Sequence, residues 1–127
     1  MAENRIIGRH VFADIRDVSA ACLRDPERIM PVLRRALDEA GYHRLKELIH
    51  RFEGGGAGFT GVILLTESHA AVHTYPEKGY LALDVFGCGA GYPTQVVEDL
   101  VSELNGELCR CEEVERSMSR VSCCNPS

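Results

Sequence analysis

A serine, two histidines and two glutamates gather in the segment TESHAAVHTYPE, residues 66–77, directly after the apolar run GVILL. Ser68 offers a hydroxyl nucleophile, and His73 offers a base that titrates near neutral pH. Cys88 ends the next apolar segment, and its thiol has an ordinary pKa close enough to neutrality to carry a proton. Each of these side chains alone is more often structural than catalytic, so only their joint spacing favours chemistry.

Three other kinds of site fit this sequence poorly. His69 and His73 are four residues apart, a spacing that pairs metal ligands on a helix, but the surrounding residues predict a strand. A triad of Ser68, His73 and Asp84 lacks the Gly-x-Ser-x-Gly turn of hydrolases. The glycine run at 54–58 lacks the Lys-Ser or Lys-Thr that follows in a phosphate loop. The six cysteines contain no CxxC pair, so we expect no bound metal.

The composition bounds the class of protein. The 127 residues predict a single domain, residues 1–127, with ordinary fractions of apolar (45%) and charged (26%) residues. No apolar stretch approaches the ~20 residues that span a bilayer, and the N-terminal segment has charges where a secretory signal needs apolar residues. We therefore expect a cytoplasmic protein with no membrane partner and no disulfide framework. A net charge of −5 argues against a nucleic-acid partner. The excess of acidic residues lies after Glu67, which suits the binding of a cationic ligand.

The residue patterns predict alternating strands and helices. Asp25 as N-cap and Pro26 at the first position begin a helix that ends near Gly41. The other expected segments are strands at 5–16, 44–52, 60–69, 70–76, 80–88 and 107–116, a flexible glycine-rich loop at 53–58, a hairpin turn at 77–79 and a second helix at 92–106. The order β-α-β-β-β-α-β, give or take one strand, predicts an α+β fold. We expect a two-layer sandwich, in which an antiparallel sheet carries two helices on one face.

The central block resembles a known family. Glu-Ser-His is followed by His-Thr-aromatic-Pro-Glu, Gly-Tyr, Asp-x-aromatic and Cys-Gly in TESHAAVHTYPEKGYLALDVFGCG, and GRH (8–10) and HRF (50–52) match two earlier strands. This pattern, over roughly residues 5–105, is similar to that of the prokaryotic pyruvoyl-dependent S-adenosylmethionine decarboxylase proenzyme family.

The resemblance implies a specific chemistry. The proenzyme would cleave itself between Glu67 and Ser68 into residues 1–67 and 68–127, and Ser68 would become a pyruvoyl group. The pyruvoyl ketone would form a Schiff base with the substrate amine and accept the electrons left by carbon dioxide. In this family pattern His73 matches the residue that transfers a proton during processing, Thr60 a residue that supports processing, and Cys88 the proton donor in decarboxylation.

The same resemblance implies a substrate and a partner. Phe52 and Tyr75 would flank the adenine of S-adenosylmethionine, Glu77 would hold its ribose, and the product would supply aminopropyl groups for spermidine and other polyamines. The family forms dimers, so we expect a homodimer of cleaved protomers. The glycine-rich loop at 53–58 and FGCG in place of Phe-Thr-Cys-Gly depart from the family pattern. These departures leave arginine or ornithine open as substrates, and a non-catalytic regulatory relative is a further alternative.

Overall fold

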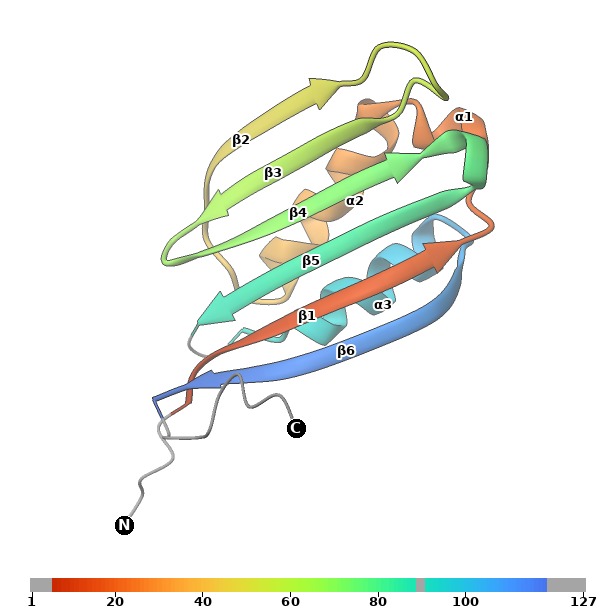
Figure 1. Cartoon of the computed structure of the whole chain (residues 1–127). Coiled ribbons are helices and arrows are strands. Elements are labelled where there is room, and N and C mark those ends of the chain that lie inside the picture. The colour runs from red at the N-terminus through yellow and green to blue at the C-terminus, as the bar shows by residue number, and fades with distance from the viewer. Residues whose placement is uncertain (1–5, 89–90, 119–127) are drawn as a thin grey trace, which may run out of the picture.

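The computed structural model describes residues 6–88 and 91–118, and it consists of one antiparallel sheet with all helices on one side (Figure 1). The sequence-predicted strand 107–116 and helix 92–106 are both present, with slightly different ends. In chain order the elements are β1 (Ile6–Arg16), α1 (Ala20–Leu23), α2 (Pro26–Glu39), β2 (Arg44–Arg51), β3 (Phe59–Leu65), β4 (Ser68–Tyr75), the 3₁₀ turn η1 (Pro76–Lys78), β5 (Tyr80–Cys88), α3 (Pro93–Glu103) and β6 (Glu107–Ser117). No helix in the described part of the chain is long and apolar enough to cross a membrane.

The six strands lie in the order β2-β3-β4-β5-β1-β6, and every neighbouring pair is antiparallel. Strands β2 to β5 follow one another as hairpins, whereas β1 inserts between β5 and β6. Val11 of β1 therefore lies opposite Val85 of β5 on one side and Glu113 of β6 on the other. This arrangement makes the first strand an interior strand of the sheet and β2 and β6 its edges.

The two faces of the sheet have different environments, because side chains alternate along each strand. The helices cover one face, and the other face, which we call the open face, carries no described element (Figure 1). The buried, helix-facing residues of β4 are Ser68, Ala70, Val72 and Thr74. The residues of β4 on the open face are His69, Ala71, His73 and Tyr75.

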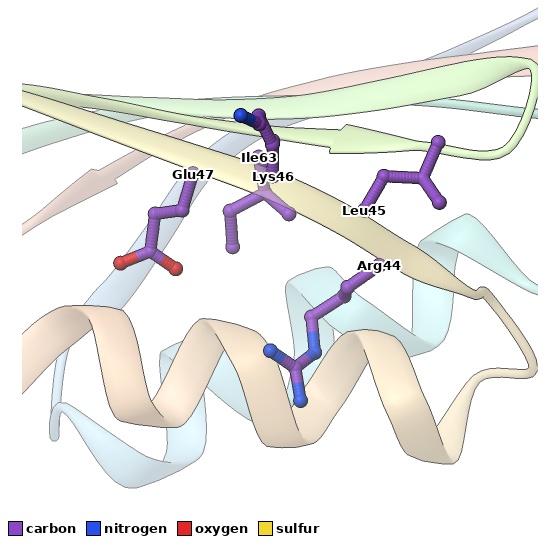
Figure 2. A pocket seen from close by; sticks show the side chains of 5 residues that line it. All are labelled: Arg44, Leu45, Lys46, Glu47 and Ile63. Atoms are coloured by element: carbon purple, nitrogen blue, oxygen red, sulfur yellow. The ribbon is translucent and has the colours of Figure 1, made fainter.

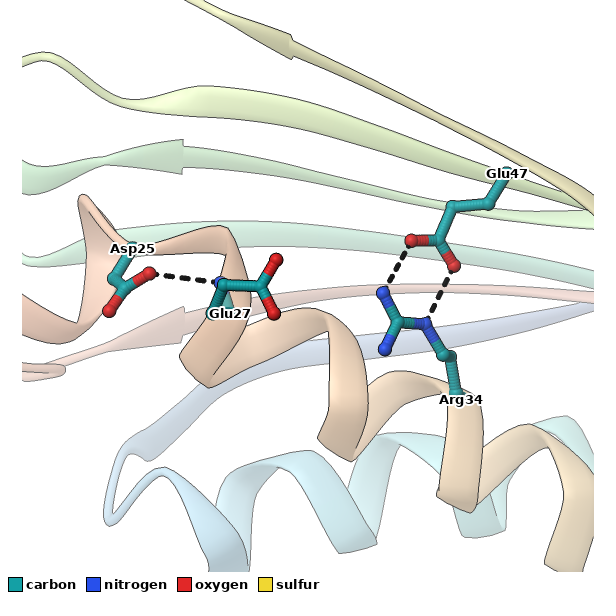
Figure 3. Close-up of polar contacts among 4 residues, drawn as sticks. All are labelled: Asp25, Glu27, Arg34 and Glu47. Carbon is teal, nitrogen blue, oxygen red and sulfur yellow. Dashed lines mark hydrogen bonds and ion pairs between the residues drawn. The ribbon is translucent and has the colours of Figure 1, made fainter.

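Helix α2 supplies most of the layer that covers the sheet. Asp25 accepts a hydrogen bond from the backbone N–H of Glu27 at 3.0 Å, as predicted for the N-cap, and Pro26 occupies the first turn. Glu47 of β2 accepts two hydrogen bonds from Arg34, at 2.8 and 2.6 Å, and so ties the helix to the edge strand (Figure 3). The apolar stripe of α2 that is buried in the core consists of Ile29, Met30, Leu33, Ala36 and Leu37.

The structure agrees with the predicted order within its margin of one strand, since four strands lie between the two main helices. It corrects two details. A single-turn helix, α1, capped by Ser19, precedes α2 and was not predicted. The predicted strand 60–69 is interrupted, because β3 ends at Leu65 and β4 begins at Ser68. The two-residue turn between them is too short to break the apolar pattern, so the sequence did not reveal it.

The cysteines in the described part of the chain are free thiols, namely Cys22, Cys88, Cys109 and Cys111. Cys123 and Cys124 lie outside the described residues.

Candidate active site

The Glu67–Ser68 peptide bond lies at the tip of the β3–β4 hairpin. Leu65 pairs with Ser68, so Thr66 and Glu67 form the two-residue connection between the strands. Glu67 has a φ of 64°, in the left-handed region that usually holds Gly or Asn at such a turn. A non-glycine residue in this region costs roughly 1–3 kcal/mol, so the turn stores strain next to the bond expected to break.

Two nucleophilic side chains flank this peptide bond. The Cys88 thiol, at the end of β5, donates a hydrogen bond to the carbonyl oxygen of Glu67 at 3.1 Å. Ser68 is 8% exposed, and its hydroxyl donates to the carbonyl oxygen of Thr66 at 3.2 Å. The hydroxyl and the thiol that the sequence singled out are therefore adjacent to the same carbonyl group.

Thr60 and His73 form a second polar pair. They lie opposite each other in the β3–β4 ladder, and the Thr60 hydroxyl is 2.9 Å from Nδ1 of His73. The bond fixes the orientation of the imidazole on the open face.

The structure separates the sequence-predicted site residues into two groups. His73 lies five residues after Ser68 along β4, a separation of ~17 Å at ~3.3 Å per residue. Because five is an odd number, the two side chains also project from opposite faces of the sheet, Ser68 toward the helices and His73 to the open face. His73 therefore does not reach Ser68 within one chain. We call Glu67, Ser68 and Cys88 the cleavage group. The residues that lie at the other end of the strands, the recognition group, are Phe52, Thr60, His73, Tyr75 and Glu77.

The aromatic members of the recognition group lie on either side of the start of β3. Phe52 donates its backbone N–H to the carbonyl of Gly58 at 2.8 Å, and a Cβ at Gly58 would overlap the carbonyl oxygen of Thr74. Phe52 and Tyr75 are thus two strand spacings apart, about 10 Å. They are 39% and 38% exposed, and Tyr75 also contacts the Tyr80 ring at 5.6 Å between centroids. Two exposed aromatic rings at this separation form a platform for a flat apolar group.

The glycine-rich loop at 53–58, which we predicted to be flexible, packs against the recognition group. A Cβ at Gly56 would overlap the carboxylate of Glu77. Gly54 and Gly55 have positive φ values of 79° and 56°, which explains why this tight path uses glycine. The loop therefore borders Glu77 directly, and its length and composition shape the surroundings of that carboxylate.

The open face carries an apolar patch beyond these polar residues. Leu48 of β2 pairs with Val62 of β3. Leu48 is 72% exposed, Val62 is 36% exposed, and Leu64, also on β3, is 49% exposed. They line a hollow of about 370 Å³ together with Lys46 and Glu47. A second hollow, of about 170 Å³, lies at the edge of the sheet beside α2 and contains no residue of either group (Figure 2). A sheet face with this much exposed apolar surface is typical of a contact surface.

Two residues near these groups were missed by sequence reasoning. His50 lies opposite Thr60 in the β2–β3 ladder, so His50, Thr60 and His73 stand abreast on three strands. The HRF segment contained this signal, because His50 lies two residues before Phe52 and side chains two apart share a face of the predicted strand. Tyr42 packs on Gly87 next to Cys88, and no sequence signal marked it. In the described part of the chain, no cluster of three or more His, Cys, Asp or Glu side chains is arranged to hold a metal ion.

Comparison with known proteins finds matches over most of the chain. The family model described as S-adenosylmethionine decarboxylase matches residues 9–117. A protein of Moorella thermoacetica named S-adenosylmethionine decarboxylase proenzyme is 34% identical over 115 residues, covering 90% of each chain. A protein of the same name from a Sulfurihydrogenibium species is 40% identical over 119 residues, covering 93% of this chain and 88% of its own.

Two further relatives bear on the fold and the substrate. The crystal structure of the adenosylmethionine decarboxylase from Aquifex aeolicus superposes with a TM-score of 0.73 at 28% identity, covering 92% of this chain and 94% of that one. A protein of Caldivirga maquilingensis named arginine decarboxylase proenzyme is 33% identical over 119 residues, covering 92% of this chain and 89% of its own.

Fold and matches together define an α+β enzyme of the decarboxylase class. The chain belongs to the S-adenosylmethionine decarboxylase family.

Proposed function

We propose that this protein is an S-adenosylmethionine decarboxylase that makes its own pyruvoyl group from Ser68 and supplies the aminopropyl donor for polyamine synthesis. The observation that carries the proposal is the cleavage group. A strained Glu67 carbonyl has the Cys88 thiol at 3.1 Å from its oxygen and is bonded to a serine whose hydroxyl is close by. These are the features that an internal attack on a peptide bond requires.

Self-cleavage would use the side chains of this chain in defined roles. The Ser68 hydroxyl attacks the carbonyl carbon of Glu67, and the peptide bond becomes an ester. The negative charge that develops on the Glu67 oxygen is stabilised by the hydrogen bond from Cys88, a donor that is already oriented. Relief of the left-handed turn at Glu67 favours this step.

The ester would then break by elimination. Loss of the α-proton of residue 68 expels the Glu67 carboxylate, because the bond between Cβ and the ester oxygen breaks. The dehydroalanine left at position 68 takes up water and releases ammonia, which leaves the pyruvoyl group. The products would be residues 1–67 and 68–127.

The pyruvoyl group that we propose at position 68 supplies an electron sink for decarboxylation, as a carbonyl cofactor does in other enzymes. Cys88 holds a proton on its sulfur next to this position, which suits it to protonate the substrate carbon after carbon dioxide leaves. The burial of this position supports the assignment, because Ser68 is only 8% exposed and little water reaches its side chain.

A homodimer would unite the two groups of residues. If the open faces of two copies meet across a two-fold axis that lies between the sheets and runs across the strands, each recognition group meets the open-face side of the partner copy's cleavage group. Cys88 lies on that side, because it alternates with the buried Gly87 along β5. This dimer is supported by the separation of Ser68 from His73 in one chain and by the apolar patch at Leu48, Val62 and Leu64. His73 and Thr60 would then act on the cleavage site of the other protomer.

The choice of substrate rests on the recognition group. Phe52 and Tyr75 present aromatic rings that suit adenine and a sulfonium cation, and Glu77 offers a carboxylate for ribose hydroxyls. Arginine is the second candidate, because the Caldivirga relative is named an arginine decarboxylase proenzyme and the loop at 53–58 changes the surroundings of Glu77. A carboxylate beside that loop would equally bind a guanidinium group.

Carbon dioxide release from S-adenosylmethionine, arginine and ornithine, assayed side by side, tests this proposal. We expect the purified protein to cleave and to release carbon dioxide fastest from S-adenosylmethionine. Faster release of carbon dioxide from arginine or ornithine would show that the substrate assignment is wrong, while the proposed pyruvoyl chemistry would stand. Cleavage without release from any of the three would reject the decarboxylase assignment.

A further inference from the structure

Tyr42 is a buried residue with an unused hydrogen-bond donor. It follows α2 directly, is only 9% exposed, and its backbone N–H is bonded to the carbonyl of Leu37. The phenol oxygen is fully buried and has no hydrogen-bond partner among the residues that the structure describes. Leaving such a hydroxyl unpaired destabilises the folded chain. Buried polar groups without a partner are rare, so this one calls for an explanation.

The phenol points into the corner that holds the cleavage group. A Cβ at Gly87 would overlap the Tyr42 hydroxyl, so the absence of a side chain at Gly87 is what admits it. Gly87 precedes Cys88, which donates to the Glu67 carbonyl. Phe86 pairs with His69, and the next position along the two strands brings Gly87 opposite Ser68. Residues opposite each other in a sheet are about 5 Å apart.

The phenol also lies on the correct face of the sheet. Ser68 and Gly87 are both buried on the helix-facing side, as the alternation of β4 and β5 requires. Tyr42 reaches Gly87 from the end of α2, which belongs to the same layer. The hydroxyl and the side chain of residue 68 therefore share one buried environment beneath the sheet.

We propose that the Tyr42 hydroxyl donates a hydrogen bond to the oxygen of the pyruvoyl group at position 68 and so positions and polarises that carbonyl. The inference rests on the proposed function. In the intact chain the Ser68 hydroxyl donates to the carbonyl of Thr66, and the Tyr42 hydroxyl has no partner among the described residues. Processing converts residue 68 into a pure acceptor, and the donor gains its partner.

The phenol is suited to this role over a wide pH range. Burial, with Cys88 as a smaller cause, raises the pKa of Tyr42 to about 12, so the hydroxyl keeps its proton under all ordinary assay conditions. A neutral donor can polarise a carbonyl without transferring its proton to it.

Tyr42→Phe removes the hydroxyl and keeps the ring, so it tests the inference directly. Phenylhydrazine forms a coloured hydrazone with a free carbonyl and reports on residue 68 without any substrate. We expect hydrazone formation and kcat to fall by about 2- to 12-fold, the range that one neutral hydrogen bond allows, with KM nearly unchanged. In the uncleavable Ser68→Ala background, adding Tyr42→Phe should leave the midpoint of thermal unfolding the same or raise it, because the buried hydroxyl that it removes is unpaired in the intact chain. Tyr92→Phe, at a 68% exposed tyrosine, is the matched control and should behave as wild type.

Gly87→Ala provides a second variant, since its methyl group would displace the phenol without removing it. It should reduce the rate of hydrazone formation as Tyr42→Phe does. Wild-type rates of hydrazone formation and turnover in Tyr42→Phe would overturn the inference, whatever Gly87→Ala does. A wild-type protein that neither cleaves nor forms a hydrazone would instead refute the proposed function on which the inference rests.

Discussion

The Cys88 thiol donates a hydrogen bond to the carbonyl oxygen of Glu67, across 21 residues of sequence, at 3.1 Å. The bond joins the end of β5 to the tip of the β3–β4 hairpin and bridges the peptide bond that we expect to break. It places Cys88 next to the reacting atoms in the intact chain.

Ser68→Ala should abolish self-cleavage, because no hydroxyl remains to attack the Glu67 carbonyl. Mass spectrometry should find residues 1–67 and 68–127 as separate chains in the wild type, and the intact 14.0 kDa chain in the variant. Ser102→Ala, at an exposed serine of α3, controls for the loss of a hydroxyl elsewhere. Cleavage of Ser68→Ala at the same bond would disprove the mechanism.

Cys88→Ala should have two effects of different size. Self-cleavage should slow by about 2- to 12-fold, since one neutral hydrogen bond to the Glu67 oxygen is lost. Decarboxylation should slow by about 100-fold or more, because the variant lacks the group that we propose as proton donor. Timed mass spectra measure the first rate and carbon dioxide release the second. Cys109→Ala, at an exposed thiol, is the control and should leave both rates unchanged. A rate of decarboxylation in Cys88→Ala equal to that of the wild type would show that Cys88 is not the proton donor.

Co-expression of Ser68→Ala and His73→Ala chains tests whether the site is shared between protomers. Each variant alone should remain uncleaved. In a mixed dimer, the intact Ser68 of the His73→Ala chain meets the intact His73 of its partner, so that chain should cleave. Differently tagged chains allow the mixed dimer to be purified and its fragments to be weighed. A mixed dimer in which both chains stay intact would show that the two groups do not meet across an interface.

Tyr75→Ala should weaken substrate binding without affecting cleavage, because Tyr75 lies at the recognition end of β4, far from Glu67. Loss of a stacking ring worth ~1–3 kcal/mol should raise KM for S-adenosylmethionine by about 5- to 150-fold. Tyr75→Phe keeps the aromatic face and is the matched control. Steady-state kinetics of both variants measure the effect. An unchanged KM in Tyr75→Ala would exclude stacking on this ring.

The Arg34–Glu47 pair should make stability depend on pH (Figure 3). The hydrogen bonds from Arg34 lower the pKa of Glu47 below its ordinary value of 4.5 in the folded protein. Because the pKa of Glu47 is lower in the folded protein than in the unfolded chain, the ion pair stabilises the protein fully at pH values above the pKa of the unfolded state. This stabilisation is lost as the pH falls through the pKa of the folded state. Glu47→Gln should therefore lower the free energy of unfolding by about 1 kcal/mol at neutral pH and match wild type in strong acid.

Urea denaturation at several pH values measures this dependence. Glu103→Gln removes the comparable pair with Arg35, whose side chains are 49% and 45% exposed, and should change stability less. If Glu47→Gln lowers the free energy of unfolding by the same amount in strong acid as at neutral pH, the ion pair with Arg34 is not the cause of the loss.

The sequence alone was sufficient for the local features. The apolar periodicity and the caps of α2 predicted the helices and most strands, because these depend on neighbouring residues. The motif from Glu67 to Cys88 predicted the family, which the comparisons confirm, while the pyruvoyl chemistry that it implies stays a prediction. The turn at Thr66–Glu67 was not recognised, since a two-residue connection between apolar strands leaves the pattern almost intact.

Only the tertiary structure decided how these residues are distributed in space. Sequence spacing placed Ser68 and His73 in one constellation, but strand geometry puts them on opposite faces and at distant positions along β4. Conversely, Tyr42 is far from Gly87 in sequence and touches it in the fold. Contacts between strands and across layers depend on which elements pair, and that choice minimises the free energy of the whole chain rather than of any segment. The division into a cleavage group and a recognition group, and the place of Tyr42 beside the first, are therefore properties of the fold.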